Sequence, residues 1–202
     1  MPTLLTGLTT THEALAERLD RAESAHQDPD PRRTRDDIRQ RVDFLATASR
    51  HLAAVESTLV PIVRHRLPDG AGRARDLVRQ CRRLEVALTQ ARGKLSGSAY
   101  AVRRPWSSLW SDVRRELDAT CELERACVES LADELGDDDA EVAERLTAAE
   151  TRGPTRAHPY LPHSGPVGRI ARGVATRIDA FWDATQGRVP PEPVLPRSRD
   201  DS

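Results

Sequence analysis

The chain has 202 residues, of which 38% are hydrophobic, 31% are charged and only 3% are aromatic. This length suits one globular domain with appendages. Strands are enriched in aromatic and β-branched residues, so a core that Leu, Val and Ala must fill favours helices packed on helices. The sequence therefore predicts an all-α fold.

The charge distribution and the N-terminal residues indicate which partners and which cellular location to expect. The formal net charge is −1, and Lys94 is the only lysine among 31 basic residues. The arginine clusters, such as "RRTR" and "RQCRR", are interleaved with acids, which is typical of a solvated surface and argues against nucleic-acid binding. The opening "MPTLLTGLTTTHEALAE" turns polar too early for a signal peptide or a membrane span. We expect a cytoplasmic protein that binds neither nucleic acid nor membrane, with its three cysteines reduced.

The first two predicted helices follow apolar stripes. A helix over residues 5–22 has apolar residues three and four apart and ends at "HQDPDPR". A second stripe over residues 38–63 follows a predicted N-cap at Thr34 and stops at "LPDG". Pro61 falls near the end of this stripe, where the loss of one backbone donor should kink the helix without abolishing it.

Two more long stripes complete a bundle. Residues 77–95 form a third helix before "SGSAYAVRRP", and a fourth begins with Pro105 in its first turn and ends before Gly136. Long stripes joined by mostly short connections predict an up-down-up-down four-helix bundle over residues 1–136, with additional C-terminal helices.

The remaining residues should add to this bundle. Residues 137–187 comprise a short helix N-capped by acids ("DDDAEVAERLTAAE"), a loop with His158 and His163 at the surface, and a helix over residues 167–182. One face of that last helix is so apolar that it should dock on the bundle. Residues 188–202 should be a disordered tail.

Several polar side chains fall on or beside the apolar stripes, each near the middle of its helix: His12, His51, Glu56, Cys81 and Glu124. A buried polar group without a partner costs on the order of 1–3 kcal/mol, so each of them needs a partner. Helix midpoints lie at one level in an antiparallel bundle, where these side chains can converge. Two explanations stay open: a metal site built by His and Glu from facing helices, or side chains that are each satisfied by a separate hydrogen bond.

The segment "HLAAVESTLVP" resembles the second-helix signature of the hemerythrin-like, HHE cation-binding family. In that signature a histidine is followed four residues later by a ligand glutamate, often by a second glutamate, and then by a proline. His51, Glu56 and Pro61 fall at the positions of the histidine, the second glutamate and the proline. Val55 occupies the position of the ligand glutamate, and a valine supplies no donor atom to a metal.

The resemblance covers residues 4–135. His12 in "TTTHEALAERL" matches the first-helix histidine, and Glu124 in "DATCELERACVESL" matches the glutamate of a fourth-helix HxxxE motif. Cys81 and Thr120 stand where the family has histidines. The stretch "PTRAHPYLPHSG" also resembles an extension found on hemerythrin-like proteins of bacteria with high-arginine genomes.

The family's histidine and carboxylate ligands hold a non-haem di-iron centre used for oxygen binding, sensing, or iron and nitric-oxide chemistry. An iron pair needs bridging carboxylates and several imidazoles, and the surviving positions cannot supply them. The resemblance therefore implies a non-enzymatic binding or regulatory module, with a possible protein partner, a degenerate di-iron site and no cofactor. The residual candidates for metal ligands are His12, His51, Glu56 and Glu124.

Two alternative functions also follow from these residues. The residual ligands, with Cys81 as a soft ligand, are suited to a single iron or zinc ion in a redox or gas sensor. Cys121 and Cys127 suggest thiol redox chemistry, but they are six residues apart and point in different directions on a helix, which disfavours a disulfide between them.

Overall fold

The computed structural model describes residues 3–25, 31–97 and 103–153, and every regular element in these ranges is helical. The all-α prediction is therefore confirmed. In chain order the elements are α1 (Leu4–Ser24), α2 (Pro31–Ala54), the π-helical turn η1 (Val55–Leu59), α3 (Val60–Arg66), α4 (Gly70–Leu95), α6 (Trp106–Leu135), the 3-10 turn η2 (Gly136–Asp138) and α7 (Asp139–Arg152).

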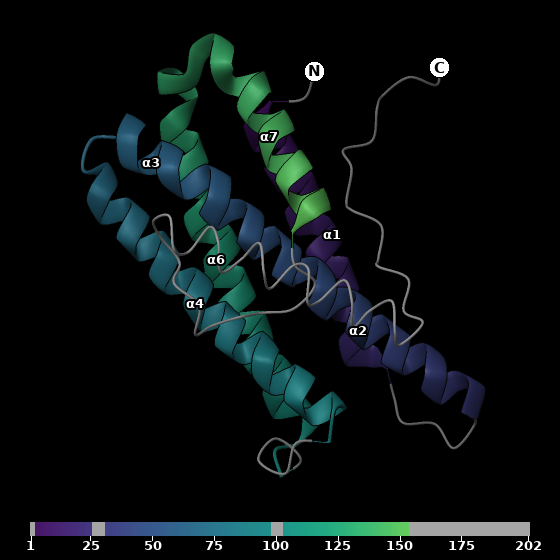
Figure 1. Ribbon diagram of the computed structural model, residues 1–202. Helices are drawn as coiled ribbons and strands as arrows, with labels where there is room; N and C mark the ends of the chain where they lie inside the picture. Colours follow the sequence, from purple (N-terminus) through teal and green to yellow (C-terminus); the bar gives the residue numbers. More distant parts are fainter. Residues whose placement is uncertain (1–2, 26–30, 98–102, 154–202) are drawn as a thin grey trace, which may run out of the picture.

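The long helices lie side by side around a shared core. Figure 1 shows α1, α2, α4 and α6 together, with α7 lying along α1 and α2. Helix α4 packs on α6, α1 packs on both α2 and α6, and α7 packs on α1, α2 and η1. The core consists mainly of Leu, Val and Ala, as the composition indicates. It includes Leu59 and Leu117, which are 1% and 2% exposed.

Helices α2 and α3 form one rod that is widened in the middle by η1. At the end of this turn the Val60 N–H donates to the Val55 carbonyl, a spacing of five residues where an α-helix has four. Pro61 follows directly, and a proline has no N–H to donate and crowds the carbonyl four residues before it. The widened turn accommodates the proline, so the helix continues through it, as expected.

The start of α2 corrects one sequence prediction. The helix begins at Pro31, so Thr34 lies inside its first turn and is not the N-cap. Proline suits a first helical position because its missing N–H would have no intrahelical partner there. The buried stripe also begins later than residue 38, where it was predicted to begin, because the first turns face solvent: Arg35 is exposed, and so is Ile38 at 44%.

A tight turn between α3 and α4 sets the start of α4. Asp69 adopts a left-handed conformation with φ of 53°, which Asp tolerates better than most residues. Gly70 follows with its α-carbon against α3, because a β-carbon there would lie 2.3 Å from the Val63 carbonyl oxygen. Helix α4 therefore starts at Gly70 and extends the predicted stripe of residues 77–95 toward the N-terminus.

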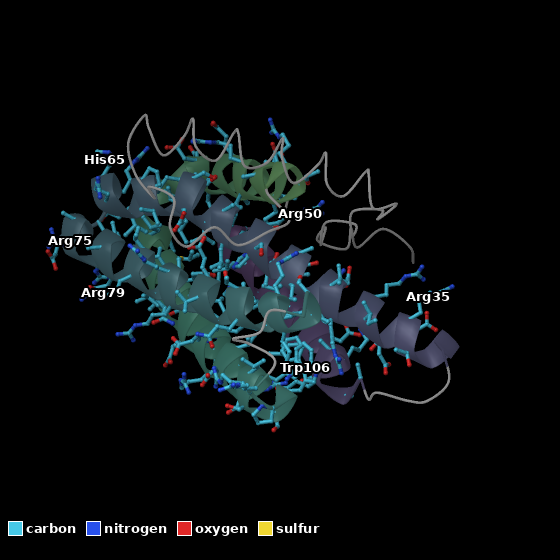
Figure 2. All side chains as sticks on the ribbon, turned by 60° about the horizontal axis from the view of Figure 1, so that its bottom comes forward. Arg35, Arg50, His65, Arg75, Arg79 and Trp106 are labelled. Carbon is cyan, nitrogen blue, oxygen red and sulfur yellow. The ribbon has the colours of Figure 1, made fainter. Side chains whose placement is uncertain are left out.

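The aromatic side chains among the described residues, Phe44, Trp106 and Trp110, lie together where α6 begins. Trp106 stacks on Trp110 with ring centroids 5.5 Å apart, and Phe44 meets Trp110 edge-on at 6.0 Å. The Arg41 guanidinium lies 4.5 Å from the Trp106 ring centroid. Figure 2 shows Trp106 near this end of the molecule. These three aromatic residues thus lie at one end of a largely aliphatic core.

Basic side chains are distributed over the outer faces of several helices. Arg35, His65, Arg75 and Arg79 are exposed and project outward (Figure 2). Arg79 forms an ion pair with Asp76 on the same helix. This arrangement matches the interleaving of acids and bases in the sequence.

Several predictions fall on residues that the structure does not describe. These are the His158 and His163 loop, the docked helix over residues 167–182 and the tail over residues 188–202. In the part of the chain that is described, no helix is both long enough and apolar enough to cross a membrane.

Candidate metal centre

Three helices bring His12, His51 and Glu124 together in the core. His12 lies on α1, His51 on α2 and Glu124 on α6. The Nε2 atom of His12 lies 2.7 Å from Glu124 Oε2, and the Nε2 atom of His51 lies 2.9 Å from the same oxygen. One atom of each residue suited to bind a metal lies within 4.8 Å of the other two. The predicted convergence of these three residues is confirmed.

The cluster is shielded from solvent. The side chains of His12, His51 and Glu124 are 10%, 2% and 0% exposed. The two imidazole rings meet edge-on, with centroids 5.5 Å apart and planes at 88°. Glu124 Oε1 is buried and has no hydrogen-bond partner among the described residues. A buried carboxylate oxygen in this state retains a lone pair that a cation can use.

A fourth residue, Glu150 of α7, joins the cluster from outside the four long predicted helices. Its Oε1 atom lies 2.7 Å from the Nδ1 atom of His51, and the residue is 6% exposed. The sequence did not indicate this contact, because the acidic segment predicts only a short added helix. A signal was present, since Val142, Leu146 and Glu150 are spaced four residues apart on one face of α7.

The carboxylates control the protonation of His51. Burial opposes a charge on the ring, but Glu124 and Glu150 outweigh it and raise the pKa of His51 to about 10. Burial also opposes ionisation of Glu124. The charge of His51 and the hydrogen bonds from both imidazoles outweigh this effect and lower the pKa of Glu124 to about 2. Without a metal, His51 and Glu124 therefore form a buried ion pair near neutral pH.

The side chains present do not fit an iron pair. Val55, Cys81 and Thr120, which occupy ligand positions in the resemblance, are all 0% exposed. Valine offers no donor atom, and the Thr120 hydroxyl donates to the carbonyl of Glu116 at 2.6 Å on its own helix. Two divalent ions need more carboxylate and imidazole ligands than this cluster holds.

The structure leaves Glu56 outside the three-residue group, although the sequence suggested it as a ligand. Glu56 is buried on η1 at 5% exposure. It follows His51 by five residues and lies in the widened turn η1, where the regular α-helical spacing does not apply. Spacing by four residues, as from His51 to Val55, is what places two ligands on one face.

A single divalent ion does fit the observed donors. Two imidazole nitrogens and one carboxylate are a common protein ligand set for iron and zinc. Glu124 Oε1 offers a further oxygen at the same place. The residues that would hold the ion are His12, His51 and Glu124, with Glu150 bound to the far nitrogen of His51.

The cysteines are poorly suited to thiolate chemistry. Burial, together with the charges of Glu124 and Glu56, raises the pKa of Cys81 well above its usual value. Burial likewise raises the pKa values of Cys121 and Cys127. A reactive or metal-binding cysteine needs a lowered pKa, so these environments disfavour the thiol redox alternative and a readily ionised Cys81 ligand.

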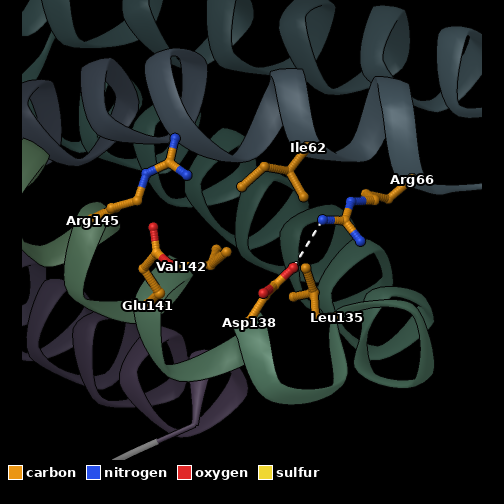
Figure 3. Close-up of a pocket in the computed structure, with 7 residues that line it drawn as sticks. All are labelled: Ile62, Arg66, Leu135, Asp138, Glu141, Val142 and Arg145. Carbon is orange, nitrogen blue, oxygen red and sulfur yellow. Dashed lines mark hydrogen bonds and ion pairs between the residues drawn. The ribbon is translucent and has the colours of Figure 1, made fainter.

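A separate hollow lies between α3 and α7, with a volume of about 250 Å³. Figure 3 shows that Arg66 and Asp138 form an ion pair across it, at 2.9 Å. Ile62 and Val142 contribute apolar surface, and none of the three clustered residues lines the hollow. It is therefore distinct from the candidate metal centre.

Comparisons with protein-family models, with curated proteins and with solved structures found no match. The hemerythrin-like resemblance stays a prediction that is based on the residues named above.

Proposed function

We propose that this protein is a divergent hemerythrin-like bundle that acts as a non-enzymatic binding or regulatory module. Its long helices form an up-down-up-down four-helix bundle, with α7 as an additional helix. Its centre is a simplified form of the family's di-iron site, with fewer ligands, and binds one divalent transition-metal ion, iron or zinc. The proposed ligands are His12, His51 and Glu124.

One observation carries this proposal. Two imidazole nitrogens from α1 and α2 meet the same Glu124 oxygen at 2.7 Å and 2.9 Å, while the other oxygen is buried without a partner among the described residues. The three donors come from three helices, and their side chains are at most 10% exposed. Such a site holds its ligands in place before an ion arrives, which reduces the cost of ordering them on binding.

The chain's own residues supply binding and orientation. Glu124 offsets part of the ion's charge, and Glu150 accepts a hydrogen bond from the Nδ1 atom of His51. Bound iron would provide redox or gas-binding chemistry, whereas zinc would provide a structural or Lewis-acid centre. Because an imidazole binds metal in its neutral form, His51 must release a proton when the ion binds.

Metal titration of chelator-treated protein tests the proposal. We expect one equivalent of Zn²⁺ or, without oxygen, of Fe²⁺ to bind per chain, as measured by calorimetry and elemental analysis. Glu124→Gln should weaken binding strongly. The matched control is Glu129→Gln, since Glu129 is exposed on the same helix. Two ions per chain, or equal binding by Glu124→Gln and wild type, would contradict the proposed site.

A metal-free module is the second candidate, and one observation favours it. Glu124 Oε2 already accepts from both imidazoles, and Glu150 already accepts from His51. The cluster can therefore serve as a closed polar network that joins the helices. No measurable binding of either ion at pH 8, where protons compete less with a metal for His51 than at pH 6, would favour this candidate.

A further inference from the structure

Helix α7 is in contact with both helices that carry the histidine ligands. At its start, Asp139 Oδ2 accepts a hydrogen bond from the Leu4 N–H of α1 at 3.0 Å. At its end, a β-carbon on Gly153 would lie 3.1 Å from the Cα atom and the carbonyl oxygen of Arg50, so the two backbones are in close contact beside His51. Between these points, Val142, Ala143 and Leu146 pack into the core.

We infer that Glu150 is a positioning residue of the metal centre, and that it couples the docking of α7 to the binding of the metal. This inference rests on the proposed function of the cluster. Its basis is the 2.7 Å contact between Glu150 Oε1 and His51 Nδ1, together with the 2.9 Å contact between His51 Nε2 and Glu124 Oε2.

The two contacts fix the role of each imidazole nitrogen of His51. Glu150 accepts a hydrogen bond from the Nδ1–H group, so a neutral His51 ring keeps its proton on Nδ1 and presents the lone pair of Nε2 toward Glu124. A carboxylate that accepts from the far nitrogen of a metal-binding histidine fixes the ring orientation and makes the ring a stronger ligand. Glu150 is 6% exposed, so little water competes for this hydrogen bond.

The coupling follows from the length and packing of α7. The helix has 14 residues, a length at which an isolated helix is marginal in water, so its stability comes from docking. A metal that strengthens the link between His51 and Glu150 favours the docked helix. By reciprocity, undocking α7 weakens metal binding by the same factor. Helix α7 therefore responds to the occupancy of the centre.

The test compares Glu150→Ala and Glu150→Gln with wild type and with a control. Glu144→Ala is the control, because Glu144 is exposed on α7 and lies away from the cluster. The Zn²⁺ affinity is measured by calorimetry well below the melting temperature. We expect Glu150→Ala to bind Zn²⁺ about 10- to 100-fold more weakly than wild type. Glu150→Gln, which keeps an oxygen acceptor, should recover part of the loss, and Glu144→Ala should match wild type.

Hydrogen exchange of the α7 amides provides a second measurement on the same proteins. In wild type, Zn²⁺ should slow exchange in α7, and this effect should shrink in Glu150→Ala. The metal-free Glu150→Ala protein should also exchange its α7 amides faster than metal-free Glu144→Ala does. A role limited to packing would change exchange and stability without the change in affinity or its partial recovery in Glu150→Gln.

The outcomes separate this inference from the proposed function. If wild type and Glu150→Ala bound Zn²⁺ equally well, the inferred role of Glu150 would be wrong, but the proposed metal site would still be supported. If wild type bound no Zn²⁺, the proposed function would fail, and the coupling to metal would fail with it. Equal α7 exchange in metal-free Glu150→Ala and Glu144→Ala would show that Glu150 does not hold α7 to the cluster at all.

Discussion

The Nε2 atom of His51 lies 2.9 Å from a carboxylate oxygen of Glu124, and the two side chains are only 2% and 0% exposed. The pair joins α2 to α6 through the centre of the molecule. Two opposite charges are stable in such a place only as partners, since either one alone would be left uncompensated in a medium of low dielectric constant.

Removing one partner should therefore be costly. We expect Glu124→Ala to lower the free energy of unfolding by about 3–5 kcal/mol, because it removes the shared partner of His12 and His51 and leaves only Glu150 to offset the buried charge of His51. Urea unfolding of the metal-free protein measures this. Glu129→Ala, at an exposed position on α6, should change the stability by less than about 0.5 kcal/mol. Similar losses in the two variants would show that the pair contributes nothing specific.

The same pair should limit the pH range of stability. The pKa of His51 is raised from 6.5 to about 10, so its contribution is complete below pH 6.5 and is lost as the pH rises through 10. The pKa of Glu124 is lowered from 4.5 to about 2, so its contribution is complete above pH 4.5 and is lost as the pH falls toward 2. The ion pair between His51 and Glu124 is thus broken both at high pH, when His51 loses its proton, and at low pH, when Glu124 gains one.

We therefore expect the contribution of this pair to be greatest between about pH 4.5 and pH 6.5. The measurement is the unfolding free energy of metal-free wild type as a function of pH, minus that of the double variant His51→Leu, Glu124→Leu. A difference that does not vary with pH would contradict the shifted pKa values.

The all-helical fold could be predicted because apolar residues three and four apart require a helix and each stripe ends at Pro or Gly. The convergence of His12 and Glu124 followed from the same reasoning, since mid-helix polar residues on apolar faces have only the core to occupy. The missed features depend on contacts between segments. Spacing alone did not show that Glu150 faces His51, because nothing local to α7 indicates which helix it packs against.

Core truncation tests the packing directly. Leu117→Ala and Leu59→Ala should each lower the free energy of unfolding by about 2–5 kcal/mol, because both residues are almost fully buried. Ile38→Ala is the control, since Ile38 is 44% exposed on α2 and loses little burial when truncated. Equal effects in a chemical denaturation series would show that this core is not the source of stability.

Restoring the missing ligands should convert the single-ion centre into a site for two iron ions. The triple variant Val55→Glu, Cys81→His, Thr120→His places a carboxylate and two imidazoles at fully buried positions. We expect it to bind iron more tightly than wild type and to approach two ions per chain, with the optical band of an oxo-bridged pair. Wild type should bind no more than one iron ion per chain and should lack this band.

The matched control for that experiment replaces exposed residues on the same helices, for example Arg75→His with Glu129→His. Iron binding by this control equal to that of the triple variant would mean that added histidines bind iron wherever they stand. An unfolded triple variant, detected by circular dichroism, would show that the core cannot accept these polar groups.

The widened turn η1 also affects how the length of the chain can vary. A π turn holds one more residue than the α turn it replaces, so the part of the rod before Val55 and the part after Leu59 follow separate registers. The part before Val55 keeps the register that places His51 in the core. The part after Leu59 keeps the register that places α3 against the turn at Gly70. Deleting one residue at η1 would therefore leave an α turn with both ends in register, and its cost would be the loss of the widened turn that accommodates Pro61.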